Sequence, residues 1–113
     1  MKVIYHVDEM ERWPLTIGNV KNMVAFYEEQ GEAFTIEVLA NAAAVAAYRR
    51  TETKGADERK RLSDAGVIFA ACSNAMKANG LAREDLYDYV TVVPAGVVEL
   101  AKRQSEGYAY IRP

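Results

Sequence analysis

Cys72 is the residue of this sequence best suited to covalent chemistry. It is the only cysteine, and it ends the wholly apolar run Val67–Ala71 just before a helix-favouring segment. A thiol between a strand and a helix meets free backbone N–H groups and the positive end of the helix dipole, and both favour the thiolate. The alternative is that Cys72 is a small buried hydrophobic residue, as most lone cysteines are.

Several polar residues lie at the ends of apolar runs and are candidates to support this thiol. In an open parallel sheet, ligands bind beyond the carboxyl ends of the strands, where the strand order reverses. A histidine on a strand next to Cys72 could stabilise its thiolate, although a lone strand histidine is more often an ordinary core residue. The supporting candidates are His6, Asp8, Asn41, Ser73 and Asn74.

Other cysteine and nucleotide chemistries lack their required partners. A phosphatase-like loop needs an arginine six residues after the cysteine, and that position is Ala78. No second cysteine is present for dithiol exchange, and one cysteine with one histidine cannot form a four-ligand zinc site. No glycine-rich phosphate loop follows the first apolar run. We therefore expect no metal and no cofactor.

Composition places the chain among ordinary globular proteins. It has 113 residues, a net charge of -2 and 50% hydrophobic residues. The charges are interspersed, so there is no basic surface for nucleic acid. No apolar run approaches the roughly 18 residues of a membrane helix, and the amino-terminal run is too short for a secretory signal. We expect a cytoplasmic protein with a single domain over residues 1–113.

Five β-rich runs alternate with segments of helical pattern, which predicts an α/β fold with a mainly parallel sheet. The expected architecture is a three-layer α/β/α sandwich of five strands in flavodoxin-like order, 2-1-3-4-5. The run 34–39 alternates apolar and polar residues, so we place it at an edge. That order puts the first strand beside the third and brings His6 toward Cys72. The runs are 2–7, 34–39, 67–72, 89–93 and 108–111, and the helical segments between them are 14–31, 41–48, 58–65, 73–79 and 94–107.

Two segments of the chain resemble the DsrE/DsrF-like family. Val67–Lys77 is similar to the segment in which that family's strand delivers Cys-x-Asn-x-Met to a helix, and Val93–Leu100 with Glu106–Ile111 resembles its last helix and strand. The similarity covers essentially the whole chain. It implies a three-layer α/β/α fold, assembly into a homotrimer or hexamer, and a link to intracellular sulfur transfer.

The resemblance also implies a role for each matching residue. Cys72 would carry sulfur as a persulfide between a donor and an acceptor protein, as a sulfurtransferase-like carrier, and Asn74 would shape its loop. Relatives often have a glycine after the asparagine that matches Asn41, whereas this chain has Ala42. Two alternatives stay open. The chain could be a non-catalytic oligomer that binds a small ligand, or a structural partner of another sulfur or redox protein.

Overall fold

The computed structural model of the chain describes residues 1–113, in which five strands form one parallel sheet. The strands are β1 (Lys2–Val7), β2 (Thr35–Ala40), β3 (Ile68–Cys72), β4 (Val90–Val93) and β5 (Ala109–Ile111). The α-helices are α1 (Trp13–Gln30), α2 (Ala56–Asp64), α3 (Ser73–Ala78) and α4 (Gly96–Ser105). The short 3-10 helices are η1 (Met10–Arg12), η2 (Ala42–Tyr48) and η3 (Arg83–Asp85).

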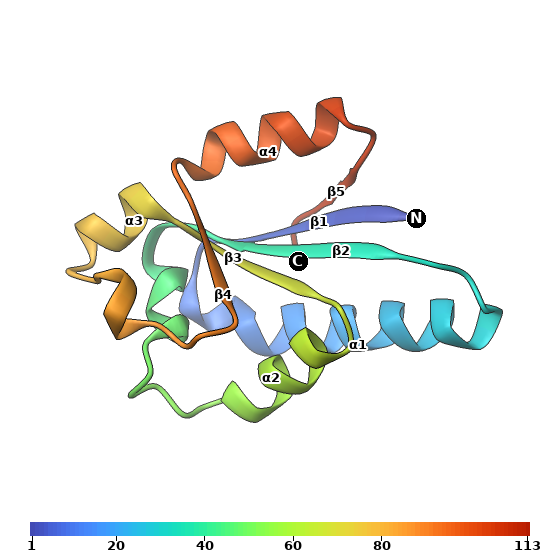
Figure 1. Cartoon of the computed structure of the whole chain (residues 1–113), viewed down its shortest axis with the longest axis horizontal. Helices are drawn as coiled ribbons and strands as arrows, with labels where there is room; N and C mark the ends of the chain where they lie inside the picture. Colours follow the sequence, from blue (N-terminus) through green and yellow to red (C-terminus); the bar gives the residue numbers. More distant parts are fainter.

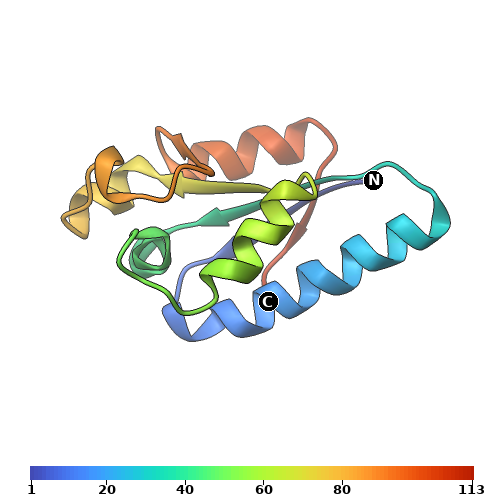
Figure 2. The ribbon, with the colours of Figure 1, turned by 60° about the horizontal axis from the view of Figure 1, so that its bottom comes forward.

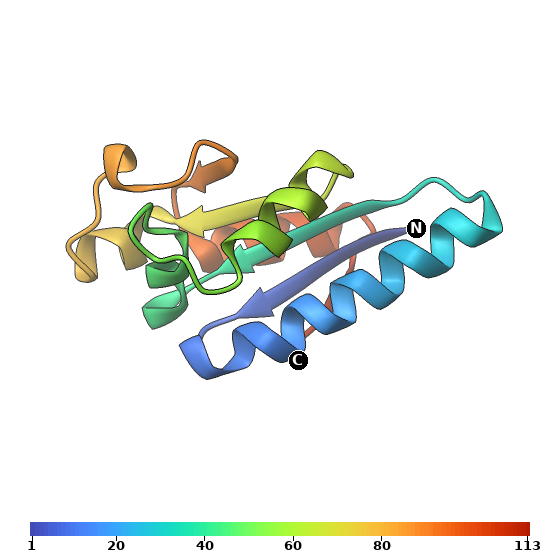
Figure 3. The ribbon, with the colours of Figure 1, turned by 90° about the horizontal axis from the view of Figure 1, so that it is seen from below.

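The helices lie on both faces of the sheet. Figure 1 shows α4 on one face and α1 with α2 on the other, and the turned views in Figures 2 and 3 show α1 and α2 together in front of the strands. This is the expected three-layer α/β/α sandwich, and each predicted strand is found within one residue of its expected bounds. The fold class predicted from the sequence is confirmed.

The strand order differs from the expected 2-1-3-4-5. The observed order is β4-β3-β2-β1-β5, so β2 is the central strand and not an edge strand. The polar residue that made β2 look half exposed is Glu37, which is 1% exposed because it forms an ion pair with Arg103 of α4 (3.0 Å). The alternation of apolar and polar residues that predicted an edge strand therefore came from one buried carboxylate that is paired with an arginine.

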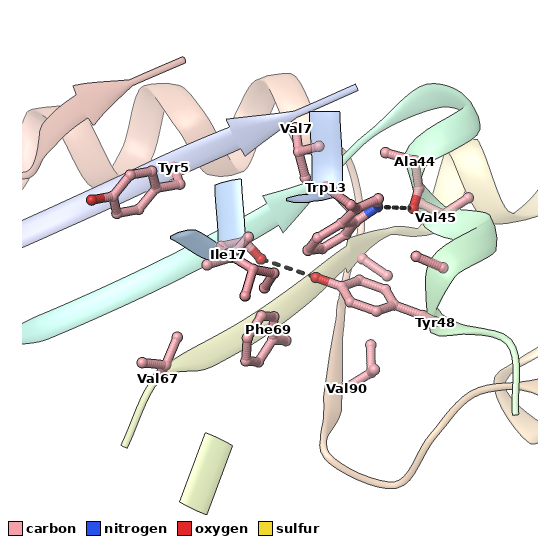
Figure 4. Close-up of a cluster of buried hydrophobic side chains, with 14 of the residues drawn as sticks. Tyr5, Val7, Trp13, Ile17, Ala44, Val45, Tyr48, Val67, Phe69 and Val90 are labelled. Carbon is pink, nitrogen blue, oxygen red and sulfur yellow. Dashed lines mark hydrogen bonds between the residues drawn. The ribbon is translucent and has the colours of Figure 1, made fainter. Parts of the chain in front are cut away.

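The larger part of the core lies between the sheet and the α1–α2 layer, and aromatic rings fill its centre (Figure 4). Tyr48 packs edge-on against Trp13 and Phe69, with ring centroids 5.4 and 6.3 Å apart. Each polar tip is bonded, since Trp13 Nε1 donates to the carbonyl of Ala44 (3.0 Å) and Tyr48 Oη donates to the carbonyl of Val38 (3.2 Å). These bonds allow two amphipathic side chains to be buried at little polar cost.

The opposite face of the sheet carries a much smaller apolar cluster under α4. It consists of Ile4, Leu39, Ala70 and Val93, with Leu100 and Tyr108 packed against it. α4 therefore rests on few apolar contacts and also uses the ion pair from Arg103 to the sheet. No helix of the chain has both the length and the apolar character needed to span a bilayer.

The segment after β2 has an unusual backbone at Ala42. Asn41 caps η2, because its Oδ1 accepts the N–H of Ala42 (2.9 Å). Ala42 has a φ of 47°, and it is the only non-glycine residue with a positive φ. The left-handed region costs a residue with a Cβ about 1–2 kcal/mol. An alanine therefore occupies a conformation that suits glycine, the residue that relatives often have after this asparagine.

We predict that Ala42→Gly raises the free energy of unfolding by about 1 kcal/mol, because glycine removes the Cβ strain at positive φ. Urea unfolding with an unchanged m-value would measure this gain. The matched control is Ala43→Gly, at the next exposed position of η2, where φ is not positive. That change should lower stability by up to about 1 kcal/mol. Equal effects of the two substitutions would contradict the account of strain at Ala42.

Candidate functional site

Cys72 is the last residue of β3 and the N-cap of α3. Its Sγ accepts the backbone N–H of Ala75 in α3 (3.4 Å) and the backbone N–H of Gly96, the first residue of α4 (3.2 Å). The starts of two helices thus converge on one sulfur. Backbone N–H groups aimed at a sulfur favour negative charge on it, and the positive ends of two helix dipoles act in the same direction.

The sulfur site is nearly closed to solvent. Cys72 is 4% exposed and belongs to the larger core cluster. It does not line any of the three main cavities of the molecule. None of these three cavities is therefore the open pocket expected at the carboxyl ends of the strands, although Sγ accepts two backbone N–H groups and is not surrounded by hydrocarbon alone.

Asn41 borders the site through Gly96. A Cβ built on Gly96 would lie 3.0 Å from Asn41 Nδ2 and 3.1 Å from its Cγ, which is closer than side chains normally approach. The absence of a side chain at position 96 thus lets the start of α4 come close to Asn41 while its N–H reaches Cys72. Asn41 was among the candidates named from the sequence, whereas Gly96 was not.

Ser73 and Asn74 occupy the first turn of α3, directly after Cys72. Ser73 is half-buried and Asn74 is exposed. Neither side chain makes a hydrogen bond within the chain, in contrast to Asn41. The role in shaping the loop that the resemblance implies for Asn74 therefore has no contact in the structure to support it.

His6 lies away from Cys72, because β2 separates β1 from β3. His6 is paired in register with Leu39, which is paired in turn with Ala70. Two strand spacings of about 4.8 Å therefore lie between the strands of His6 and Cys72. The expected juxtaposition depended on the 2-1-3-4-5 order and is lost with it.

His6 and Asp8 instead interact with the end of the chain. His6 Nδ1 lies 2.8 Å from Tyr110 Oη, and Asp8 forms an ion pair with Arg112 (3.0 Å). Burial lowers the pKa of His6 below its usual value; Asp8 opposes this shift and Arg112 adds to it. His6 is thus neutral near pH 7, and its buried Nε2 has no hydrogen-bond partner.

A buried cluster of charges under α4 was missed by the sequence reasoning. Arg103 Nε lies 3.0 Å from Glu37 and 3.1 Å from Glu99, and both carboxyl groups are less than a tenth exposed. Burial raises the pKa of Glu37 to about 7, and the neighbouring carboxyl of Glu99 adds to this rise. The four-residue spacing of Glu99 and Arg103 could have indicated their pair, but no local pattern links Glu37 to them.

No three histidine, cysteine, aspartate or glutamate side chains gather where they could hold a metal ion. The polar groups around Cys72 are backbone amides, which donate hydrogen bonds and cannot act as metal ligands through N–H. The arrangement presents one sulfur, at the junction between a strand and two helices, as the acceptor of two backbone N–H groups.

The model of the DsrE/DsrF-like family matches residues 20–113, a segment that contains Asn41, Cys72 and Gly96. The chain belongs to the DsrE/DsrF-like family. This family is associated in general with sulfur relay. No curated protein matches the chain in sequence.

Two solved structures of similar fold cover almost the whole chain. The first is a protein of unknown function, MTH1491 from Methanobacterium thermoautotrophicum, which is 38% identical, with a TM-score of 0.89 over 99% of this chain and 98% of its own. The second is the ychN protein from E. coli, with 17% identity and a TM-score of 0.77 over 100% of this chain and 99% of its own. The second comparison shows the fold alone.

Proposed function

We propose that this chain is a sulfur carrier, in which Cys72 accepts a sulfur atom as a persulfide and passes it to an acceptor thiol. The observation that carries the proposal is the pair of N–H groups, from Ala75 and Gly96, that meet at Sγ. Membership of the DsrE/DsrF-like family supports the same chemistry. The donor and the acceptor in this proposal are proteins that each present one reactive sulfur.

The transfer requires no outside oxidant. The Cys72 thiolate attacks the outer sulfur of a donor persulfide, the sulfur–sulfur bond of the donor breaks, and the donor leaves as a thiolate. Cys72 then carries a persulfide whose outer sulfur is attacked by the acceptor thiolate, and the Cys72 thiolate is regenerated. The amides of Ala75 and Gly96 would stabilise Sγ as the attacking anion in the first step and as the leaving anion in the second.

Burial of Cys72 sets a condition on this chemistry. Because the residue is only 4% exposed, a donor can reach Sγ only when the start of α3 or α4 moves aside. α4 is the better candidate to move, since it rests on a small apolar cluster whereas α3 adjoins the large core. Local opening of a weakly packed segment is a common source of access to buried groups.

The same burial favours a second function, a non-catalytic binding module in which the thiol is inert. In that case Sγ only accepts hydrogen bonds from backbone N–H groups that would otherwise lack a partner at the starts of two helices. The two functions differ in whether the folded protein takes up sulfur.

Mass spectrometry of the intact protein after incubation with a persulfide or polysulfide donor tests the proposal. We expect one added sulfur atom on the native chain and complete loss of the adduct in Cys72→Ser. The matched control is Ser73→Ala, which changes the next residue but no hydrogen bond and should keep the adduct. An adduct that forms only in urea, where Cys72 is exposed, would support the inert binding module and overturn the carrier.

A further inference from the structure

One cavity of the molecule lies away from Cys72 and has an unusual lining. It lies between the start of α1 and the segment that leads into α2, and its volume is about 730 Å³. This size falls within the range of small-molecule sites. None of its lining residues is Cys72, Gly96 or Asn41, and the residues that matter below are Trp13, Ile17, Lys21, Lys54, Gly55 and Arg59.

Arg59 gives this cavity its unusual character. It is 1% exposed and is the largest of the fully buried side chains. Its guanidinium donates to three neutral acceptors, the Tyr89 hydroxyl (3.2 Å), the Ala47 carbonyl (2.9 Å) and the Lys54 carbonyl (3.2 Å). It lies over the Trp13 ring at 5.1 Å. No carboxylate forms an ion pair with it, although buried cations are almost always paired with an anion.

One nitrogen of this guanidinium remains free to bind. All the hydrogen bonds of Arg59 use Nε and Nη2, so Nη1 donates none. Nη1 faces Gly55, where an added Cβ would lie 3.2 Å from it. Gly55 also has a φ of 74°, which suits glycine. The absence of a side chain at position 55 thus lets the one unused donor lie close to the backbone of this segment.

The other charges of the cavity do not neutralise Arg59. Lys21 forms an ion pair with Glu58 (2.9 Å), and Glu52 accepts the backbone N–H of Lys54 (3.1 Å). Glu11 also lines the cavity and has no ion pair. These carboxylates would repel a dianion, but a single negative charge placed at Nη1 would be attracted by the buried guanidinium.

We propose that this cavity binds a small apolar monocarboxylate. Its carboxylate accepts from Arg59 Nη1, and its hydrocarbon part packs against apolar walls that include Trp13 and Ile17. One oxygen suffices, because only one guanidinium nitrogen is free. The ligand supplies the anion that the buried cation lacks. This inference is independent of the sulfur-carrier function.

Trp13 reports on the site directly, because it is the only tryptophan of the chain and lies in the cavity wall. Titration of the whole protein with hexanoate should give a saturable change in tryptophan fluorescence. Hexanol has no charge, and inorganic phosphate carries more negative charge than hexanoate. Each should bind at least about tenfold more weakly than hexanoate. The proposal is overturned if hexanol binds as tightly as hexanoate or if no titration saturates.

Two substitutions locate the binding group. Arg59→Met should weaken hexanoate binding at least about tenfold. Should that variant fail to fold, Gly55→Ala gives the test, since its Cβ would lie 3.2 Å from Nη1 and displace it, which should also weaken binding several-fold. The control is Lys60→Gln, on the same helix but outside the cavity, which should bind like the parent protein. Unchanged affinity in the folded Arg59 or Gly55 variant would overturn the assignment.

Discussion

Replacing Tyr48 by alanine should lower the free energy of unfolding by about 4 kcal/mol. Tyr48 is 0% exposed and stands between the rings of Trp13 and Phe69 at the centre of the larger core cluster. Alanine removes the ring and leaves a void, because backbone elements on two sides, β2 and β3, cannot close on it. Urea unfolding followed by circular dichroism measures the loss.

Tyr48→Phe is the matched control for the ring. It removes only the hydroxyl, whose bond to the Val38 carbonyl is 3.2 Å long, and should cost about 1 kcal/mol. The difference between the two variants is then the contribution of the ring itself. Equal losses in both would mean that the hydrogen bond, and not the packing of the rings, holds this part of the core.

The pH dependence of stability should change most in Glu37→Gln. Burial raises the pKa of Glu37 in the folded chain to about 7, above its usual value of 4.5. Unfolding therefore releases a proton, so stability is fully present below pH 4.5 and is lost as the pH rises through 7. A glutamine at this position can donate to Glu99 as the protonated glutamate does, and it carries no charge to desolvate. At pH 8 we expect the variant to be more stable than the parent by about 2 kcal/mol.

The measurement is the free energy of urea unfolding at several values between pH 5 and 8. The parent should lose stability over this range, and Glu37→Gln should show a much flatter profile. Glu106→Gln is the control, because Glu106 pairs with the same Arg103 (3.0 Å) but its side chain is 40% exposed. It should keep the slope of the parent protein. An unchanged slope in Glu37→Gln would contradict the account of the buried carboxyl.

The sequence predicted those parts of the fold that depend on local patterns. Alternating β-rich runs and helical segments gave the layers and the strand bounds, and the apolar run before Cys72 placed the thiol at the junction of β3 and α3. The segment 41–48 was expected to be helical, and it forms the 3-10 helix η2 with Asn41 as its N-cap. Each of these features is fixed by residues close together along the chain.

The features that the sequence did not predict depend on contacts between distant segments of the chain. Glu37 looked solvent exposed because its partner Arg103 lies 66 residues away on α4. Arg59 lies in the segment 58–65, for which the sequence indicated only a helix, and its burial depends on the carbonyls of Ala47 and Lys54, which no periodicity indicates. The second donor to Cys72 is Gly96, which lies 24 residues further along the chain and comes close to the sulfur only in the folded structure.

The connection of β5 has a consequence for how the protein folds. β1, β2 and β3 each pair with the next strand along the chain, so the first four strands can assemble in sequence order, whereas β5 joins β1 and brings Tyr110 to His6 across 104 residues. Closing so long a loop carries a greater entropic cost than each nearest-neighbour step, which favours its formation last. In a chain in which only the first four strands had assembled, Val93 would already lie beside Cys72, and Gly96 follows three residues later. The two amides at the thiol therefore need only the first four strands, and docking of β5 completes the contact between Tyr110 and His6 as a separate last step.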